Sequence, residues 1–101
     1  MVSPAELFRL FRLGDNRYQG KVVQCHLDAG SYRLGPGRIE AYCITDRSCC
    51  VYFESTILPR DTDSPLTVAG RCFGKFTDGE HRAFGVNWFV RVTDSSVSLS
   101  P

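Results

Sequence analysis

The chain has 101 residues, of which 43% are hydrophobic and 23% are charged, so it can bury the core of one small domain but not of two. Its formal net charge of +1 excludes a globally basic nucleic-acid-binding domain and leaves a local cluster as the only route to anion binding. No run of about 18 apolar residues predicts a transmembrane helix, and the first residues lack a signal-peptide pattern, so a cytoplasmic location is expected.

Residues 1–14 carry the signals of a capped helix. Ser3 is a good N-cap, Pro4 suits the first helical position, and Glu6 completes a capping box. Gly14 ends the pattern as a left-handed cap. The apolar stripe that we expect to pack on the remainder of the domain comprises Leu7, Phe8, Leu10 and Phe11.

The rest of the chain alternates apolar and polar residues in short runs separated by turns, which predicts strands. The strongest runs are residues 21–28, 38–44, 49–55, 66–76 and 83–92, and residues 32–34 are a further short candidate. We therefore predict an all-β fold, a small closed or partly open barrel of five strands, with the N-terminal helix packed on it and a frayed polar tail at 94–101.

The predicted core takes the apolar face of each strand, with Trp88 at its centre. Its members are Val23, Cys25, Leu27, Ile39, Cys43, Val51, Phe53, Val68, Phe84, Val86, Trp88 and Val90.

Two glycines interrupt the strand LTVAGRCFGKF. Isolated glycines inside a strand pattern indicate bulges or sharp bends, and a small barrel needs such corners in order to close. Gly70 and Gly74 are the predicted corners. Strict alternation around them places Cys72 in the core and turns Arg71, Phe73 and Lys75 outward.

The entry Tyr18-x-Gly20-Lys21-x-Val23, preceded by Asn16, and the later segment Val68-x-Gly70-x-Cys72-x-Gly74 resemble the bacterial OB-fold family described as tRNA-anticodon-binding-like. The resemblance covers about residues 16–93. It implies a five-stranded OB-like barrel and a bacterial source. One departure is that the first strand, KVVQCHLD, lacks the glycine at which this barrel strand commonly bends. Because the family name rests on fold similarity, it does not by itself imply tRNA binding.

The five cysteines are predicted to be reduced thiols, with no disulfide and no metal. No C-x-x-C or H-x-x-x-H spacing occurs. Cys25, Cys43 and Cys72 are expected to be inert core residues. Cys49 and Cys50 point to opposite sides of an extended chain, so at most one of them is expected to be buried.

The sequence carries no catalytic motif. No Gly-x-Ser-x-Gly or phosphate-binding loop is present, and neither His26 nor His81 has a carboxylate partner that sequence can identify. Asp61 and Asp63 lack the remaining positions of a calcium loop. The chain is thus expected to be non-enzymatic and to need no cofactor.

Binding is the better-supported function. Single-strand binders combine cations that follow the phosphates with aromatic rings on which bases stack. Residues of both kinds are expected to face outward on the predicted strands, namely Tyr32, Arg33, Arg38, Tyr42, Tyr52, Arg71, Phe73, Lys75, Phe89 and Arg91. The predicted nucleic-acid-binding residues are Arg33, Arg38, Tyr42, Tyr52, Arg71, Phe73 and Lys75. The alternative is a protein-interaction or assembly subunit, including a homo-oligomer, that uses an exposed barrel face or edge strand.

Overall fold

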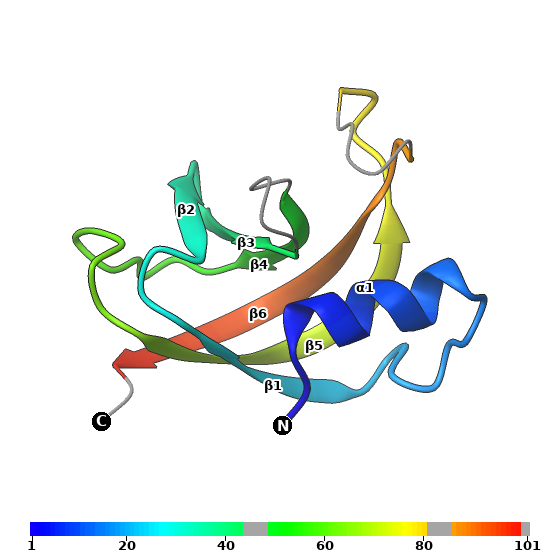
Figure 1. Ribbon diagram of the computed structural model, residues 1–101, viewed down its shortest axis with the longest axis horizontal. Coiled ribbons are helices and arrows are strands. Elements are labelled where there is room, and N and C mark those ends of the chain that lie inside the picture. The colour runs from blue at the N-terminus through cyan, green and yellow to red at the C-terminus, as the bar shows by residue number, and fades with distance from the viewer. Residues whose placement is uncertain (44–48, 81–85, 100–101) are drawn as a thin grey trace.

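The computed structural model of the protein describes residues 1–43, 49–80 and 86–99. One helix is followed by strands that form a single curved sheet (Figure 1). The elements are α1 (Pro4–Arg12), β1 (Val22–Leu27), β2 (Tyr32–Gly35), β3 (Arg38–Tyr42), β4 (Cys49–Glu54), β5 (Leu66–Phe76) and β6 (Phe89–Leu99).

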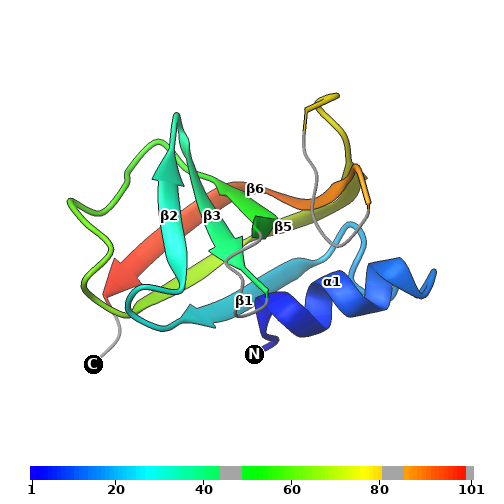
Figure 2. The ribbon, with the colours of Figure 1, turned by 45° about the horizontal axis from the view of Figure 1, so that its top comes forward.

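The sheet has six strands in the order β1-β5-β6-β4-β3-β2. Neighbouring strands are antiparallel, except that β4 and β6 run parallel. The sheet curls, so that β2 and β3 cross over the layer formed by β1, β5 and β6 (Figure 2). Strand β6 lies inside the sheet, between β5 and β4.

The prediction of a mostly β fold with one N-terminal helix is confirmed, but the strand count is wrong. The short candidate at residues 32–34 forms a separate strand, β2. It pairs with β3, whereas the preceding strand β1 pairs with β5. Residues 28–31 form a turn between β1 and β2. The sheet is not closed, so a complete barrel is not confirmed.

The helix begins as predicted, because the Ser3 side chain accepts a hydrogen bond from the backbone N–H of Glu6 at 3.0 Å. Gly14 follows the helix with a φ of 81°, the left-handed conformation that suits glycine. The apolar stripe is buried against β3, β4 and β6. Within the described ranges no helix has the length and apolar character needed to cross a bilayer.

Most of the predicted core is buried, but its centre differs from the prediction. Trp88 is only partly buried; it lies at the edge of the core and stacks on Phe8 of α1 with ring centroids 4.6 Å apart. Cys43 and Val86 are also partly buried, and Phe84 lies outside the described residues. The predicted residues that are fully buried are Val23, Cys25, Leu27, Ile39, Val51, Phe53, Val68 and Val90.

The last strand begins and ends later than predicted. The sequence alternates from Ala83, yet β6 starts at Phe89 and continues to Leu99, through residues that were expected to form a frayed tail. Pairing with β5 explains the extension, because Val97 lies opposite Val68 and Leu99 lies opposite Leu66. The polar composition reflects one solvent-facing side of a strand and not disorder.

Candidate functional site

A row of side chains crosses the sheet on the face opposite the main core. The strand register places Arg33 beside Glu40, Glu40 beside Tyr52, and Tyr52 beside Arg91. These residues alternate with core residues along their strands, so the row follows from the period of two in each strand. It gathers two of the predicted binding residues, Arg33 and Tyr52, with a cation that the prediction did not select.

Aromatic rings extend this row toward β5. Tyr52 stacks on Phe89 with centroids 4.1 Å apart, and Phe89 contacts Phe76 at 5.7 Å. Phe76 in turn meets Phe73 edge to face at 6.0 Å. These centroid separations are typical of favourable aromatic pairs. Tyr42 packs against the buried cluster that contains Tyr52 and Phe89.

Arginines lie over several of these rings. The guanidinium of Arg38 is 4.4 Å from the centroid of Tyr52, and that of Arg91 is 4.8 Å from Phe76 and 5.2 Å from Phe73. Such positions favour cation–π attraction. We call this surface the arginine–aromatic face; it comprises Arg33, Arg38, Tyr42, Tyr52, Phe73, Phe76, Phe89 and Arg91.

Two carboxylates hold the arginines in place. Glu40, which is 3% exposed, accepts hydrogen bonds from Arg33 and Arg38. The bond to Glu40 raises the pKa of Arg33 above its ordinary value. Glu54 accepts a hydrogen bond from Nε of Arg91 at 3.0 Å. The guanidinium groups are thereby oriented before any ligand arrives.

Two of the aromatic residues of the face are exposed to solvent. Phe73 is 49% exposed and Phe76 is 36% exposed, whereas Tyr52 is only 5% exposed. The expectation that Tyr52 faces outward into solvent is therefore wrong, because its ring is covered by Arg38 and Phe89. Tyr32, also expected to face outward, is 1% exposed. Burial raises the pKa of the Tyr52 hydroxyl.

A small hollow of about 120 Å³ opens beside Phe76. It has aromatic walls and carries charges of both signs, a mixture suited to a planar ligand with hydrogen-bonding edges. Its lining residues are Arg38, Tyr52, Glu54, Phe76, Asp78, Phe89 and Arg91.

The two predicted corners of β5 are both sites of register shift. The β5–β6 register changes between Ala69 and Arg71 and again between Cys72 and Gly74. A Cβ on Gly70 would lie 2.7 Å from the backbone oxygen of Thr93, and Gly74 has a φ of 113°. Both positions therefore require glycine, which confirms the expectation of bends.

The second shift changes which side chains share a surface. Arg71 and Lys75 are exposed, as predicted, but Arg71 donates a hydrogen bond to the Gly20 carbonyl and Lys75 lies over Trp88 at 4.6 Å. Phe73 instead meets Arg91. Arg71, Phe73 and Lys75 therefore do not form one continuous row on the same surface of β5. Strict alternation also misses Phe76, and the signal that could have revealed it is the bulge-forming Gly74.

The cysteine prediction is wrong in one respect, because Cys43 and Cys50 form a disulfide. Its Cα atoms are 6.0 Å apart, within the usual range for a disulfide. Cys49 and Cys50 are both buried, against the expectation of one, since Cys50 enters the main core while Cys49 packs with Tyr52 and Phe89 on the other side. Both faces of β4 are thus covered.

The other three cysteines are free and buried. Burial raises the pKa of Cys25 to about 12 and those of Cys49 and Cys72 to about 11. Thiols with such pKa values are poor nucleophiles near neutral pH.

In the part of the chain that the structure describes, no group of three His, Cys, Asp or Glu side chains could hold a metal ion. His26 does contact a carboxylate, Asp28, at 3.1 Å, which the sequence alone did not indicate. Both side chains are on the surface. His81 lies outside the described residues.

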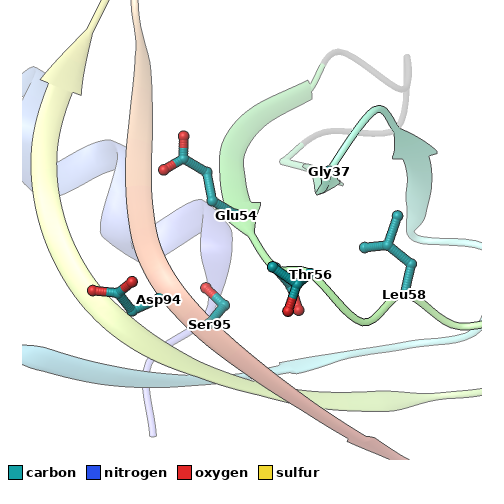
Figure 3. A pocket seen from close by; sticks show the side chains of 7 residues that line it. Gly37, Glu54, Thr56, Leu58, Asp94 and Ser95 are labelled. Atoms are coloured by element: carbon teal, nitrogen blue, oxygen red, sulfur yellow. The ribbon is translucent and has the colours of Figure 1, made fainter.

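A second and larger hollow of about 590 Å³ lies where β4 and β6 diverge. Figure 3 shows Asp94 and Ser95 on β6 on one side and Gly37 and Leu58 on the other, with Glu54 and Thr56 between them. Both charged residues in its lining are acidic, so it differs in character from the arginine–aromatic face.

No protein-family model, curated protein or solved structure matches this chain.

Proposed function

We propose that the protein is a non-enzymatic OB-like module that binds single-stranded nucleic acid on the arginine–aromatic face. The observation that carries this proposal is the pair of exposed rings, Phe73 and Phe76, with the guanidinium of Arg91 within 5.2 Å of both centroids. Single-strand binders use this combination, because bases stack on the rings while cations contact the phosphates.

The order of strands supports the OB-like part of the proposal. The two outermost strands of the sheet, β1 and β2, are consecutive in the chain and are separated only by residues 28–31. If β1 and β2 count as one strand broken by that turn, the sheet becomes five strands that return on themselves. This is the barrel implied by the resemblance to the bacterial OB-fold family described as tRNA-anticodon-binding-like.

The location of the face supports the ligand class. OB folds bind oligonucleotides on the face of their second and third strands. With β1 and β2 counted together, those strands are β3 and β4, which carry Arg38, Tyr42 and Tyr52. The face therefore overlaps the expected OB surface at these three residues and extends from it to Phe73 and Phe76 on β5 and Arg91 on β6.

Each part of the face has a distinct role in this proposal. Phe73 and Phe76 stack bases, Tyr52 and Tyr42 support the rings from below, and Arg91 contacts phosphate beside them. The other phosphate contacts of the face come from Arg33 and Arg38, whereas Arg71 and Lys75, which contact Gly20 and Trp88, lie outside it. Because neutralised phosphates release counterions, the affinity must fall as salt rises.

This role would place the protein in the cytoplasm. Thiols there are kept reduced, so the Cys43–Cys50 disulfide would be a reversible bond formed under oxidising conditions.

Binding of labelled oligothymidylate and oligouridylate of about a dozen nucleotides, measured by fluorescence anisotropy at about 50 and 200 mM salt, tests the proposal. We expect saturable binding that weakens at the higher salt. Salt-tolerant self-association, detected as a higher mass without oligonucleotide binding, would favour the alternative of an assembly subunit that uses the same exposed rings.

A further inference from the structure

Strand β6 has a free edge along its second half. Its pairing with β4 involves only Val90 to Val92, whereas its pairing with β5 continues to Leu99. Among the residues that the structure describes, residues 96–99 therefore pair on one side only, while Asp94 and Ser95 lie in the register shift opposite Gly70 and have no register partner in β5. Alternate backbone N–H and C=O groups of this segment face the open side and can accept another strand.

The larger hollow lies directly beside this free edge. Asp94 and Ser95 line it from β6, and Leu58 lines its far side from the segment after β4 (Figure 3). The hydroxyl oxygen of Ser95 is buried and has no hydrogen-bond partner within the described part of the chain. This oxygen lies against Gly70 of β5, in the space that a Cβ at that position would need, so the open part of the hollow at β6 is formed by Asp94.

The charges and apolar groups around this edge define what would fit. The hollow has the carboxylates of Glu54 and Asp94 and no basic residue in its lining. Further along the edge, Val97 is partly buried and Leu99 is 69% exposed. A complementary strand would therefore place a positive charge at the hollow and apolar side chains at alternate positions beyond it.

We propose that the free edge of β6 binds an extended peptide segment as an added strand, with a lysine or arginine of that segment entering the hollow between Glu54 and Asp94. Main-chain hydrogen bonds supply affinity in this mode, and alternate side chains supply specificity. The site adjoins the arginine–aromatic face, because Glu54 lines the hollow and also accepts a hydrogen bond from Arg91, so Asp94 is the carboxylate without that partner. Peptide binding at this edge does not depend on nucleic-acid binding.

A second copy of the chain fits the edge less well. Residues 93–99 include Asp94 but no lysine or arginine, so self-pairing of β6 offers the acidic hollow no positive charge. A basic peptide supplies it.

The test uses the full chain and two synthetic peptides of about eight residues that alternate valine and threonine, one with a terminal lysine and one with glutamate in its place. Binding is measured by NMR titration of the backbone amides and by hydrogen exchange in the complex. We expect the lysine peptide to bind more tightly than the glutamate peptide, and the amides of residues 95–99 to shift and gain protection.

A charge variant checks the location. Asp94→Asn removes the carboxylate, while asparagine tolerates the φ of 52° at this position. It should weaken binding of the lysine peptide by about two- to fivefold, the range for one exposed ion pair. Asp63→Asn, which removes an exposed carboxylate that does not line the hollow, should leave binding unchanged.

Three outcomes would overturn the proposal: no peptide binding, shifts confined to the arginine–aromatic face, or equal binding of both peptides that Asp94→Asn does not alter. A concentration-dependent dimer in which residues 95–99 are protected without peptide would also overturn it, because the edge would then belong to a second copy.

Discussion

The ring of Tyr52 stacks on that of Phe89 with the two planes inclined at 26°, and this pair lies beneath the exposed part of the arginine–aromatic face. Tyr52 comes from β4 and Phe89 from the start of β6. The two strands are parallel neighbours, so the position of Phe89 is fixed by its contact with Tyr52. Phe76 packs on Phe89 and is positioned by it in turn. The exposed rings therefore sit on a rigid support, which lowers the entropy lost when a ligand stacks on them.

Replacing Phe73 with alanine should weaken oligonucleotide binding by about 1–3 kcal/mol, since one stacking platform is lost. The slope of affinity against salt should not change, because stacking releases no counterions. Anisotropy titrations at several salt concentrations measure both quantities. Ile57→Ala is the matched control, because Ile57 is 75% exposed and lies off the face. Equal affinities for the two variants would remove Phe73 from the site.

Replacing Arg91 with alanine should flatten the salt slope by about 0.7, the value for one phosphate contact on a single strand. Arg91→Lys should restore the slope but only part of the affinity, because lysine keeps the charge and loses the planar contact with the rings. Arg60→Ala removes an exposed charge from the β4–β5 connection and should leave the slope as it is. An unchanged slope in Arg91→Ala would mean that this arginine serves only to pack the rings.

Glu40→Gln should have opposite effects on stability and binding. The carboxylate is buried and accepts from both Arg33 and Arg38, so its loss should lower the free energy of unfolding by about 1–3 kcal/mol. The same change frees two guanidinium groups, which should raise affinity for the oligonucleotide and steepen the salt slope. Urea unfolding and anisotropy give the two values. An unchanged affinity and an unchanged salt slope would show that these arginines do not contact phosphate.

Reduction of the Cys43–Cys50 disulfide should lower the free energy of unfolding by about 2–3 kcal/mol, the loop-closure effect for a short loop. Urea unfolding with and without reductant measures the change. The variant Cys43→Ala/Cys50→Ala should not respond to reductant. Labelling provides a second check: unfolded, unreduced protein should react at the three free cysteines, Cys25, Cys49 and Cys72, and at all five after reduction. Five reactive thiols without reductant would contradict the disulfide.

Stability should fall as pH rises above about 9. Burial raises the folded-state pKa of Cys25 to about 12 from an ordinary value of 9.0, and those of Cys49 and Cys72 rise in the same direction. Their contribution is therefore complete below pH 9, where the thiols are protonated in both states. It is lost as pH rises toward the folded values, because the unfolded chain releases its protons first. Unfolding at pH 8, 9 and 10 should show the decline, with a smaller slope in Cys25→Ala/Cys72→Ala; equal slopes would contradict the assignment.

The helix and the inner faces of most strands could be predicted because both depend on local patterns. Ser3, Pro4 and Gly14 define the helix through their own backbone preferences, and the alternation of Val23, Cys25 and Leu27 reflects one buried side of a sheet. The seven-residue separation of Cys43 and Cys50 carries no such local signal, since pairing depends on how β3 and β4 meet.

The candidate site was harder to predict because strict alternation ends near the bulge: burial alternates through Lys75, yet the next residue, Phe76, is exposed as well. Gly74 gave a sign that β5 bends, but not how many residues the bend would insert opposite β6. Phe73 was expected to face outward and is exposed. The exposure of Phe76 was not predicted. Trp88 was misplaced for a related reason: its run alternates cleanly, yet the residue lies just before the paired part of β6.

The central position of β6 also bears on how the chain folds during synthesis. Strands β1 and β5 on one side, and β2, β3 and β4 on the other, are joined in the sheet only through β6. A ribosome makes the chain at roughly 5–20 residues per second, so both groups emerge before the strand that connects them. Until residues 89–99 leave the exit tunnel, two unpaired edges remain exposed on the nascent chain. We therefore expect translation-arrested chains that end before Phe89 to bind chaperones. Once the eleven residues of β6 have emerged, the whole sheet should fold in one step.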